Sequence, residues 1–388
     1  MRQSIVVHSE EIDSATAGRS LGERVAQAFD DQSPDVLIVF ASSKHDYRVL
    51  LQSLDQACRP ELMVGCSSAG EFISGTFGVS SACAVALRSS EMKFAAGIGR
   101  EVGIDRKAAV QQMVAPFQGL SGQQFVFRSA LVLTDALAGY AEELVESLTL
   151  ATAGRYQLFG GGAGDDARFS RTHVFYGTEA LTNAAVALEI LSNKPLGVGV
   201  QHGWKPTGRP MRVTEAEGTR VVSINAAPAI EAFQQHALQN GQPFERENPL
   251  PFFLHNILGI DTGSGFKLRV PLAIGEDGSV SCAAEIPTGA TVHVMSATGM
   301  SAAEAAAQAT ETALARLGNN PPEVALFFDC VATRLRMGGE FGMELHALQE
   351  ALGAASYAGC NTYGQISRAD GQFSGFHNCT AVICVFPK

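Results

Sequence analysis

The sequence predicts an α/β fold in which repeated strand–helix–strand units form mixed sheets with helices packed on them, in two domains. Three observations support this prediction. Short apolar runs alternate with amphipathic helical patterns, and the alternation recurs at three places along the chain. Hydrophobic residues make up 46% of the sequence and charged residues 17%. A chain of 388 residues with this composition can bury a sizeable core and fits two or three domains.

The first unit starts at Asp35 and has four parts. They are an apolar strand, a helix, a glycine-containing segment and a late apolar strand, over residues 36–40, 47–58, 63–72 and 83–87. The helix is indicated by apolar residues spaced three and four apart. The first strand ends in the small polar residues Ser42 and Ser43. This order favours a right-handed crossover in which the helix covers one face of the sheet.

The same four parts return twice in the same order. The second copy occupies residues 130–133, 140–148, 158–164 and 184–188, and the third occupies residues 324–328, 341–352, 357–366 and 381–385. The distance from Asp35 to Gly65 equals the distance from Ala130 to Gly160. The third copy is longer, which an insertion around residues 334–340 explains.

Ligands of open α/β sheets bind at the carboxyl ends of the strands, and small residues leave room there. Copies one and three also share the pattern Gly-Cys-x-x-x-Gly, and such glycines let backbone approach closely. The glycines could equally serve only to make tight turns between packed elements. The candidate residues at this ligand-binding edge are Ser42, Ser43, Cys66, Ser67, Asp135, Cys360, Tyr363 and His377.

A connecting region follows the second copy. It contains apolar runs, turn residues and short strand patterns up to about residue 298, before an alanine-rich helix leads to the third copy. We place the domain boundary near residue 222. The N-terminal domain is expected over residues 20–222 and the C-terminal domain over residues 223–388.

Charge and patterning argue against several classes of protein. The formal net charge of −11 disfavours binding to nucleic acid or to an anionic membrane. No apolar run approaches the length that spans a bilayer, and the N-terminus lacks the apolar region of a secretory signal. The eight cysteines form no Cys-x-x-Cys pair, and most lie in apolar runs. This use of cysteine is typical of a reducing cytosol, so we expect a cytoplasmic protein.

An ordered set of segments resembles the FIST family. The segments are residues 36–42, 64–71, 202–206, 358–366 and 376–380. The resemblance covers nearly the whole chain, with FIST N-terminal and C-terminal domains in sequence. The chain departs from common family patterns at Gln365, where Glu is frequent, and at Cys379, where an amide residue is frequent.

The resemblance implies a sensory protein of signal transduction that binds a small ligand. One branch of the family consists of stand-alone proteins that bind haem, sense nitric oxide and act on a histidine kinase of a two-component system. This chain carries no kinase module of its own, so a partner kinase would be regulated in trans. A homodimer is also compatible with the sequence.

Haem requires an axial ligand in an apolar pocket, and a neutral imidazole can supply it. His202 is the first candidate for the iron, since it lies among apolar strand residues beside Trp204 and Gly203. His45, at a strand-to-helix switch, is the second candidate. A histidine hydrogen-bonded to the backbone in a core or turn is the structural alternative at both places.

Other chemistries have weaker patterns. Cys66 and Cys360 lie in equivalent glycine-flanked turns, where an enzyme could expose a thiolate, but no pattern identifies a base beside them. No zinc spacing or phosphate loop is present. The sequence therefore favours a non-enzymatic sensor. Haem-dependent nitric oxide sensing is the first hypothesis, a metal-free sensor of another ligand such as an amino acid is the second, and a cysteine-dependent enzyme is the third.

Overall fold

The computed structural model describes residues 3–78, 81–122, 124–369 and 374–388, and it confirms the α/β class and the three repeats. In each repeat two strands pair in parallel and a late strand pairs antiparallel to the first of them. In the first repeat these elements are β2 (Val36–Ser42), α2 (Tyr47–Cys58), β3 (Leu62–Ser68) and β6 (Ala82–Leu87).

The second and third repeats follow the same plan. The second contains β8 (Phe127–Thr134), α4 (Ala141–Ala151), β9 (Gln157–Gly162) and β12 (Ala184–Ser192). The third contains β23 (Pro322–Cys330), α9 (Gly342–Leu352), β24 (Ser356–Thr362) and β27 (Ala381–Pro387). The extra residues of the third repeat form α8 (Val331–Met337) and a 3-10 turn, Gly338–Phe341, at the place where an insertion was predicted.

The repeats form three separate sheets, which exchange hairpins in a cycle. The hairpin of the first repeat joins the third sheet, that of the second joins the first sheet, and that of the third joins the second sheet. These hairpins are β4–β5 (Glu71–Ile73 and Thr76–Gly78), β10–β11 (Val174–Tyr176 and Glu179–Leu181) and β25–β26 (Gln365–Arg368 and Gly375–His377). Each sheet also has one further strand beside its late strand, namely β1 (Ser4–Ser9), β7 (Met92–Arg100) and β13 (Gly197–Gln201).

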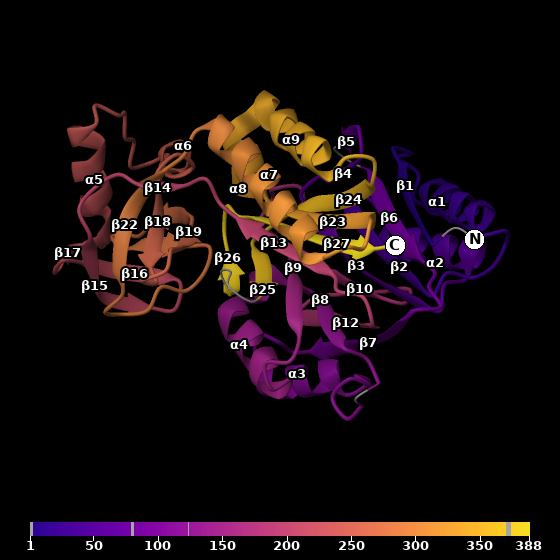
Figure 1. Cartoon of the computed structure of the whole chain (residues 1–388). Coiled ribbons are helices and arrows are strands. Elements are labelled where there is room, and N and C mark those ends of the chain that lie inside the picture. Colours follow the sequence, from indigo (N-terminus) through magenta and orange to yellow (C-terminus); the bar gives the residue numbers. More distant parts are fainter. Residues whose placement is uncertain (1–2, 79–80, 123, 370–373) are drawn as a thin grey trace.

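The three sheets share one central core, and helices cover their outer faces (Figure 1). Inward-facing residues such as Phe40, Leu133 and Phe328 are fully buried and pack together. The helices that cover the first, second and third sheets form pairs. These are α1 (Ser14–Ala28) with α2, α3 (Arg106–Val114) with α4, and α7 (Gly299–Arg316) with α9.

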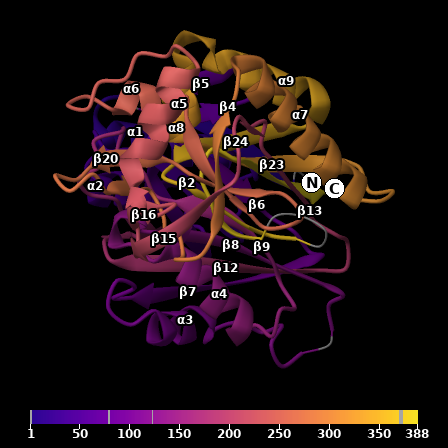
Figure 2. The ribbon, with the colours of Figure 1, turned by 90° about the vertical axis from the view of Figure 1, so that its left-hand side faces the viewer.

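Residues 205–298 form a separate nine-stranded sheet, called the insert here, which lies between β13 and α7 in the chain and to one side of the three-repeat body (Figures 1 and 2). The predicted division near residue 222 falls within its strand β16. Its elements are β14 (Lys205–Pro206), β15 (Met211–Glu217), β16 (Arg220–Ile224), β17 (Ala227–Pro228), α5 (Ala229–Gln239), α6 (Leu250–Phe253), β18 (Ile257–Asp261), β19 (Phe266–Arg269), β20 (Pro271–Ile274), β21 (Val280–Cys282) and β22 (Thr291–Ser296).

One glycine in each repeat allows the parallel strands to lie together. A Cβ atom built on Gly65, Gly160 or Gly359 would lie 2.0, 2.0 or 1.9 Å from a carbonyl oxygen of the neighbouring strand. These three glycines occupy equivalent positions in their sheets. Close backbone packing is therefore a property of the repeated unit.

We expect Gly359→Ala to destabilise the fold by about 1–3 kcal/mol, because its methyl group would overlap backbone that cannot move freely. Urea unfolding measures the change. Gly208→Ala is the matched control, since a Cβ at Gly208 meets nothing within 4 Å. Equal unfolding midpoints for the two variants would contradict the packing argument.

Candidate functional site

The glycine segments of the three repeats meet at one end of the body. The Ala69 amide donates a hydrogen bond to the Asn361 carbonyl over 2.9 Å. Equivalent bonds join Gly164 N to Ser67 O and Tyr363 N to Gly162 O, each over 2.9 Å. The carboxyl ends of all three parallel strand pairs are thereby brought together, as expected for a ligand-binding edge.

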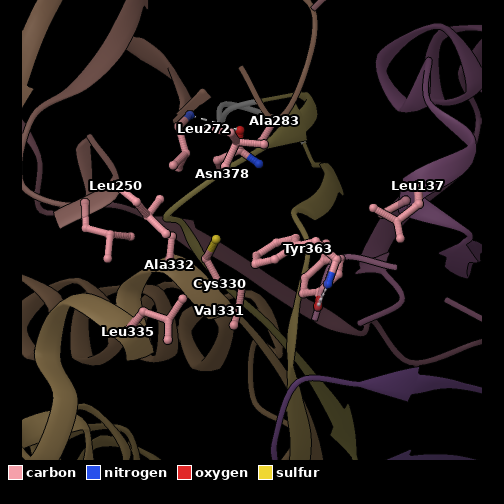
Figure 3. Close-up of a pocket in the computed structure, with 14 residues that line it drawn as sticks. Leu137, Leu250, Leu272, Ala283, Cys330, Val331, Ala332, Leu335, Tyr363 and Asn378 are labelled. Atoms are coloured by element: carbon pink, nitrogen blue, oxygen red, sulfur yellow. Dashed lines mark hydrogen bonds between the residues drawn. The ribbon is translucent and has the colours of Figure 1, made fainter. Parts of the chain in front are cut away.

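A pocket lies beside this meeting point, between the second repeat, the third repeat and the insert (Figure 3). We call it the axial pocket. Its cavity volume is about 70 Å³, and the space including the open solvent at its mouth is about 580 Å³. The described residues that line it carry no formal charge, and most are apolar. They are Ala136, Leu137, Phe169, Leu250, Leu254, Val270, Leu272, Ala283, Cys330, Val331, Ala332, Leu335, Tyr363 and Asn378.

Tyr363, a predicted site residue, forms part of the pocket wall. Its hydroxyl donates a hydrogen bond to the Asp165 carboxylate, and its ring stacks on Phe169 with centroids 4.5 Å apart. Asp165 also accepts the amides of Phe169, Ser170 and Arg171, each over 2.8 Å. Burial alone would raise the pKa of Asp165, but these hydrogen bonds outweigh it and lower the pKa. Sequence reasoning missed Asp165 and Phe169, although two acidic residues directly after a glycine segment were a visible signal.

Other predicted edge residues hold loops of the second repeat. Asp166 accepts hydrogen bonds from the Ser42 hydroxyl and the Ser43 amide, both over 2.8 Å. The Ser67 hydroxyl accepts the amide of His173 over 2.9 Å. Asp135 directly follows β8 and accepts the Asn183 amide over 2.6 Å. The structure therefore brings these residues to one end of the fold, where protein groups already bind their polar atoms.

Cys66 and Cys360 lie in the central core and have no exposed surface. Burial raises the pKa of Cys360 well above its usual value, and hydrogen bonding to Cys66 adds to this effect. A buried neutral thiol is a poor nucleophile. The location of this pair therefore gives no support to the predicted enzymatic role.

His202 does not have surroundings that fit haem. Its Nε2 atom lies 3.1 Å from the carbonyl oxygen of Phe266, so backbone occupies a direction in which iron would bind. A Cβ on Gly203 would lie 2.1 Å from the carbonyl oxygen of Ser301, which shows that α7 fills the space expected for a planar group. Trp204 packs under the guanidinium of Arg336, 5.3 Å from the ring centroid. Burial lowers the pKa of His202, consistent with a neutral imidazole bonded to backbone.

The two other predicted histidines lie apart from the axial pocket's lining. His45 is buried, with Nδ1 3.3 Å from the Ser14 hydroxyl. His377 lies in β26 and is also buried, and its pKa is lowered by burial and by the nearby charges of Lys267 and Arg269. Among the described residues, no group of three or more His, Cys, Asp and Glu is arranged to hold a metal ion.

Glu71 and Gln365 occupy equivalent positions at the ends of two exchanged hairpins. Glu71 accepts hydrogen bonds from Ser68 and Ser81, and it has no exposed surface. Gln365 donates to Thr362 over 2.8 Å and accepts the Thr380 amide over 3.3 Å. Burial raises the pKa of Glu71 to about 7. The neutral amide of Gln365 therefore makes the same kind of bridge in the third repeat as the carboxyl group of Glu71 makes in the first.

Comparison with family models identifies the chain. The FIST N domain model matches residues 35–227 and the FIST C domain model matches residues 229–368. The chain belongs to the FIST family. FIST domains are associated with sensory signalling, so this FIST protein is placed in that broad class. The FIST N model covers the first two repeats, and the FIST C model covers most of the insert and the third repeat as far as β25.

Similar proteins include two uncharacterized mycobacterial proteins. One, from Mycobacterium tuberculosis, is 24% identical over 274 residues, which cover 66% of this FIST chain and 67% of the relative. Another, from Mycobacterium bovis, is 24% identical over 247 residues, covering 59% and 60% of the two chains. A solved structure of cyanuric acid hydrolase from A. caulinodans aligns with a TM-score of 0.36 and 9% identity, over 100% of this chain and 99% of that one. Within the described ranges, no helix combines the length and apolar character needed to cross a membrane.

We expect Glu71→Gln to preserve the fold and to remove a pH dependence of stability. The native-state pKa of Glu71 is raised above the unfolded value of about 4.3, so its contribution to stability is lost as the pH rises from there through about 7. The variant should therefore gain about 1–3 kcal/mol relative to wild type between pH 5 and pH 8.5. Urea unfolding at both pH values measures the gain.

Gln365→Glu is the reciprocal variant. It should lose stability over the same pH interval, because it places a carboxylate in the equivalent buried bridge. If the free energy of unfolding depends on pH in the same way in wild type and in both variants, the raised pKa assigned to Glu71 is wrong.

Proposed function

We propose that this FIST protein is a sensor that binds a small, largely apolar molecule in the axial pocket. The observation that carries the proposal is the composition of the pocket wall. Aliphatic and aromatic side chains from three parts of the chain surround the space, with Tyr363 and Asn378 as polar groups that could orient a ligand. Small-molecule sites in proteins commonly have this character. The described residues of the wall offer no charged partner for a zwitterion such as an amino acid.

The rim of the pocket supports the same proposal. Leu137, Phe169 and Leu335 are each exposed by more than 40%, although their neighbours in the pocket wall are largely buried. Clustered apolar side chains in contact with water favour a ligand or partner that covers them. Burying this surface would supply part of the binding free energy.

A ligand in the pocket would contact both the insert and the repeats, which gives it a means of signalling. Polar contacts join the two parts near the pocket. Arg269 of the insert donates to the Phe376 carbonyl over 2.9 Å and pairs with Glu142 over 3.0 Å. The Val270 amide donates to Asn378 over 3.4 Å. A ligand that binds one arrangement of these parts more tightly than another shifts their populations.

We propose further that the signal passes to a histidine kinase in trans, with ligand binding and no turnover by the FIST chain itself. The family's association with sensory signalling and the exposed apolar rim support this proposal. Autophosphorylation of a candidate kinase, with and without the FIST protein and the ligand, tests it. A kinase rate that is the same in every mixture would count against the partner.

The haem form of the proposal, with nitric oxide as the signal, has a separate test. Protein purified after expression with added haem precursor, or mixed with haemin, would show a Soret band that shifts with nitric oxide. Loss of this band in His202→Ala would support ligation by His202. The contacts of His202 and Gly203 instead lead us to expect colourless protein.

We expect Leu137→Glu to weaken binding of a neutral apolar fluorophore such as Nile red by about fivefold or more. The substitution removes apolar contact at the rim and adds a charge that binding would desolvate. A fluorescence titration measures the dissociation constant.

Leu150→Glu is the matched control, because Leu150 is 80% exposed on α4 and does not line the axial pocket. It should leave binding unchanged. If both variants bind the fluorophore as wild type does, the axial pocket is not its site.

A further inference from the structure

A pair of cysteines lies beside the axial pocket, with Cys330 in its wall and Cys379 behind it in the same buried cluster. Cys330 is the last residue of β23, and Cys379 precedes β27, the antiparallel neighbour of β23. Both side chains belong to one buried cluster, and the Cys379 thiol donates a hydrogen bond to the Cys330 sulfur. Cys330 lines the axial pocket, and Figure 3 shows its sulfur directed toward the side of the pocket where Asn378 lies.

The backbone around Cys330 matches backbone that binds an aspartate side chain in the second repeat. Its equivalent in the second repeat is Asp135, by the register of the parallel strands. The Asp135 carboxylate accepts the amide of Leu137, two residues ahead, over 3.1 Å. It also accepts the amide of Asn183, which precedes the late strand, over 2.6 Å.

The third repeat presents the same two donors to sulfur. The amides of Ala332 and Cys379 are the equivalents of the Leu137 and Asn183 amides, and both contribute to lowering the pKa of Cys330. Cys379 and Asn183 even share a left-handed backbone conformation, with φ of 48° and 49°. The Cys330 sulfur therefore occupies a position whose donors stabilise negative charge.

These hydrogen bonds change the chemistry of the Cys330 thiol. The bond from Cys379, assisted by the two amides and Gln365, outweighs burial and lowers the pKa of Cys330 to about 7. Most other thiols of the chain behave in the opposite way. Burial or hydrogen bonding raises the pKa of Cys58, Cys83, Cys282, Cys360, Cys379 and Cys384. Sequence reasoning chose Cys66 and Cys360 because of their glycine-rich turns and overlooked this pair.

We propose that Cys330 and Cys379 form a dithiol site that is oxidised by an organic hydroperoxide whose apolar group occupies the axial pocket. The inference rests on the proposed ligand-binding function and names the chemical class of the ligand. A thiolate reacts with the peroxide bond, an adjacent thiol resolves the product, and the apolar wall holds the organic group.

The reaction balances in two steps. The Cys330 thiolate attacks the terminal oxygen of the hydroperoxide, the oxygen–oxygen bond breaks, and Cys330 sulfenic acid and an alkoxide form. The alkoxide takes the proton of the Cys379 thiol and leaves as the alcohol. The Cys379 thiolate then attacks the Cys330 sulfur, the disulfide bond forms, and hydroxide leaves and becomes water by taking from solvent the proton that Cys330 released on forming its thiolate. Both cysteines are oxidised by one electron each, and the peroxide is reduced.

The disulfide would act on the contact between the body and the insert. Cys379 is adjacent to Asn378, whose side chain accepts the Val270 amide of the insert. Two residues before Asn378, the Phe376 carbonyl accepts a hydrogen bond from Arg269 of the insert. Drawing Cys379 toward Cys330 would move this segment, so oxidation provides a covalent form of the signal proposed above.

The test is to titrate reduced full-length protein with cumene hydroperoxide and to count free thiols after denaturation. Two of the eight thiols should be lost, and peptide mapping should find Cys330 joined to Cys379. The rate should increase as the pH rises through about 7, because the thiolate is the reactive form. Cumene hydroperoxide should react at least about tenfold faster than hydrogen peroxide, since its aromatic group gains apolar contacts in the pocket.

Variants separate the roles of the two cysteines. Cys330→Ser should abolish the rapid loss of thiols, and Cys379→Ser should stop at a sulfenic acid that dimedone labels on Cys330. Cys58→Ser, which removes a buried thiol at the end of α2, is the control and should react as wild type. A wild-type rate in Cys330→Ser, or a disulfide between other cysteines, would overturn the proposal.

The same samples distinguish this inference from the proposed function. If Nile red binds in a Leu137-dependent way but Cys330 does not react with cumene hydroperoxide, the dithiol proposal fails and the ligand pocket stands. If Cys330 reacts equally with both peroxides and Leu137→Glu changes neither rate, the assignment to an organic hydroperoxide fails, and so does the pocket as its binding site.

Discussion

The cyclic exchange of hairpins between the repeats is the constraint on which the rest of the structure depends. Each sheet takes two strands from another repeat, so the three glycine segments have to meet where the hairpins leave their own sheets. Glycine at positions 65, 160 and 359 permits the close strand pairing that this geometry needs. The axial pocket exists because the meeting point leaves the ends of β8 and β23 beside the insert.

Repetition has placed different chemistry on equivalent backbone. The position that ends the first strand carries Ser42, Asp135 or Cys330, and in each repeat an amide two residues ahead donates to that side chain. The backbone therefore supplies an equivalent donor in each repeat, and the side chain that receives it differs. Ser42 holds a loop, Asp135 presents a carboxyl group, and Cys330 presents a reactive sulfur. Of these three residues, Cys330 is the one that lines the axial pocket.

The repeated elements could be predicted because their signals are local. Apolar runs and helical spacing identified β2, α2 and β3, and the order of parts identified the other two copies. The exchange of hairpins could not be predicted, since β4 has only three residues and pairs with β24, far along the chain. The contact between Tyr363 and Asp165 and the pairing of Cys330 with Cys379 could not be predicted for the same reason, because each joins residues that are far apart in the sequence. Sequence reasoning about His202 depended on Gly203 leaving room for a cofactor, whereas the glycine admits the backbone of α7.

The hairpin exchange also has a consequence for synthesis on the ribosome. The hairpin β4–β5 is made early, but the third sheet that receives it exists only after residues 356–362 have emerged. At about 5–20 residues per second, this interval is on the order of 15–60 seconds. During that time Phe72 lacks Phe327 and Tyr357, the aromatic side chains that it contacts in the folded chain. A nascent chain that stops before the third repeat thus presents an apolar hairpin with no sheet to join, which makes such fragments candidates for chaperone binding and proteolysis.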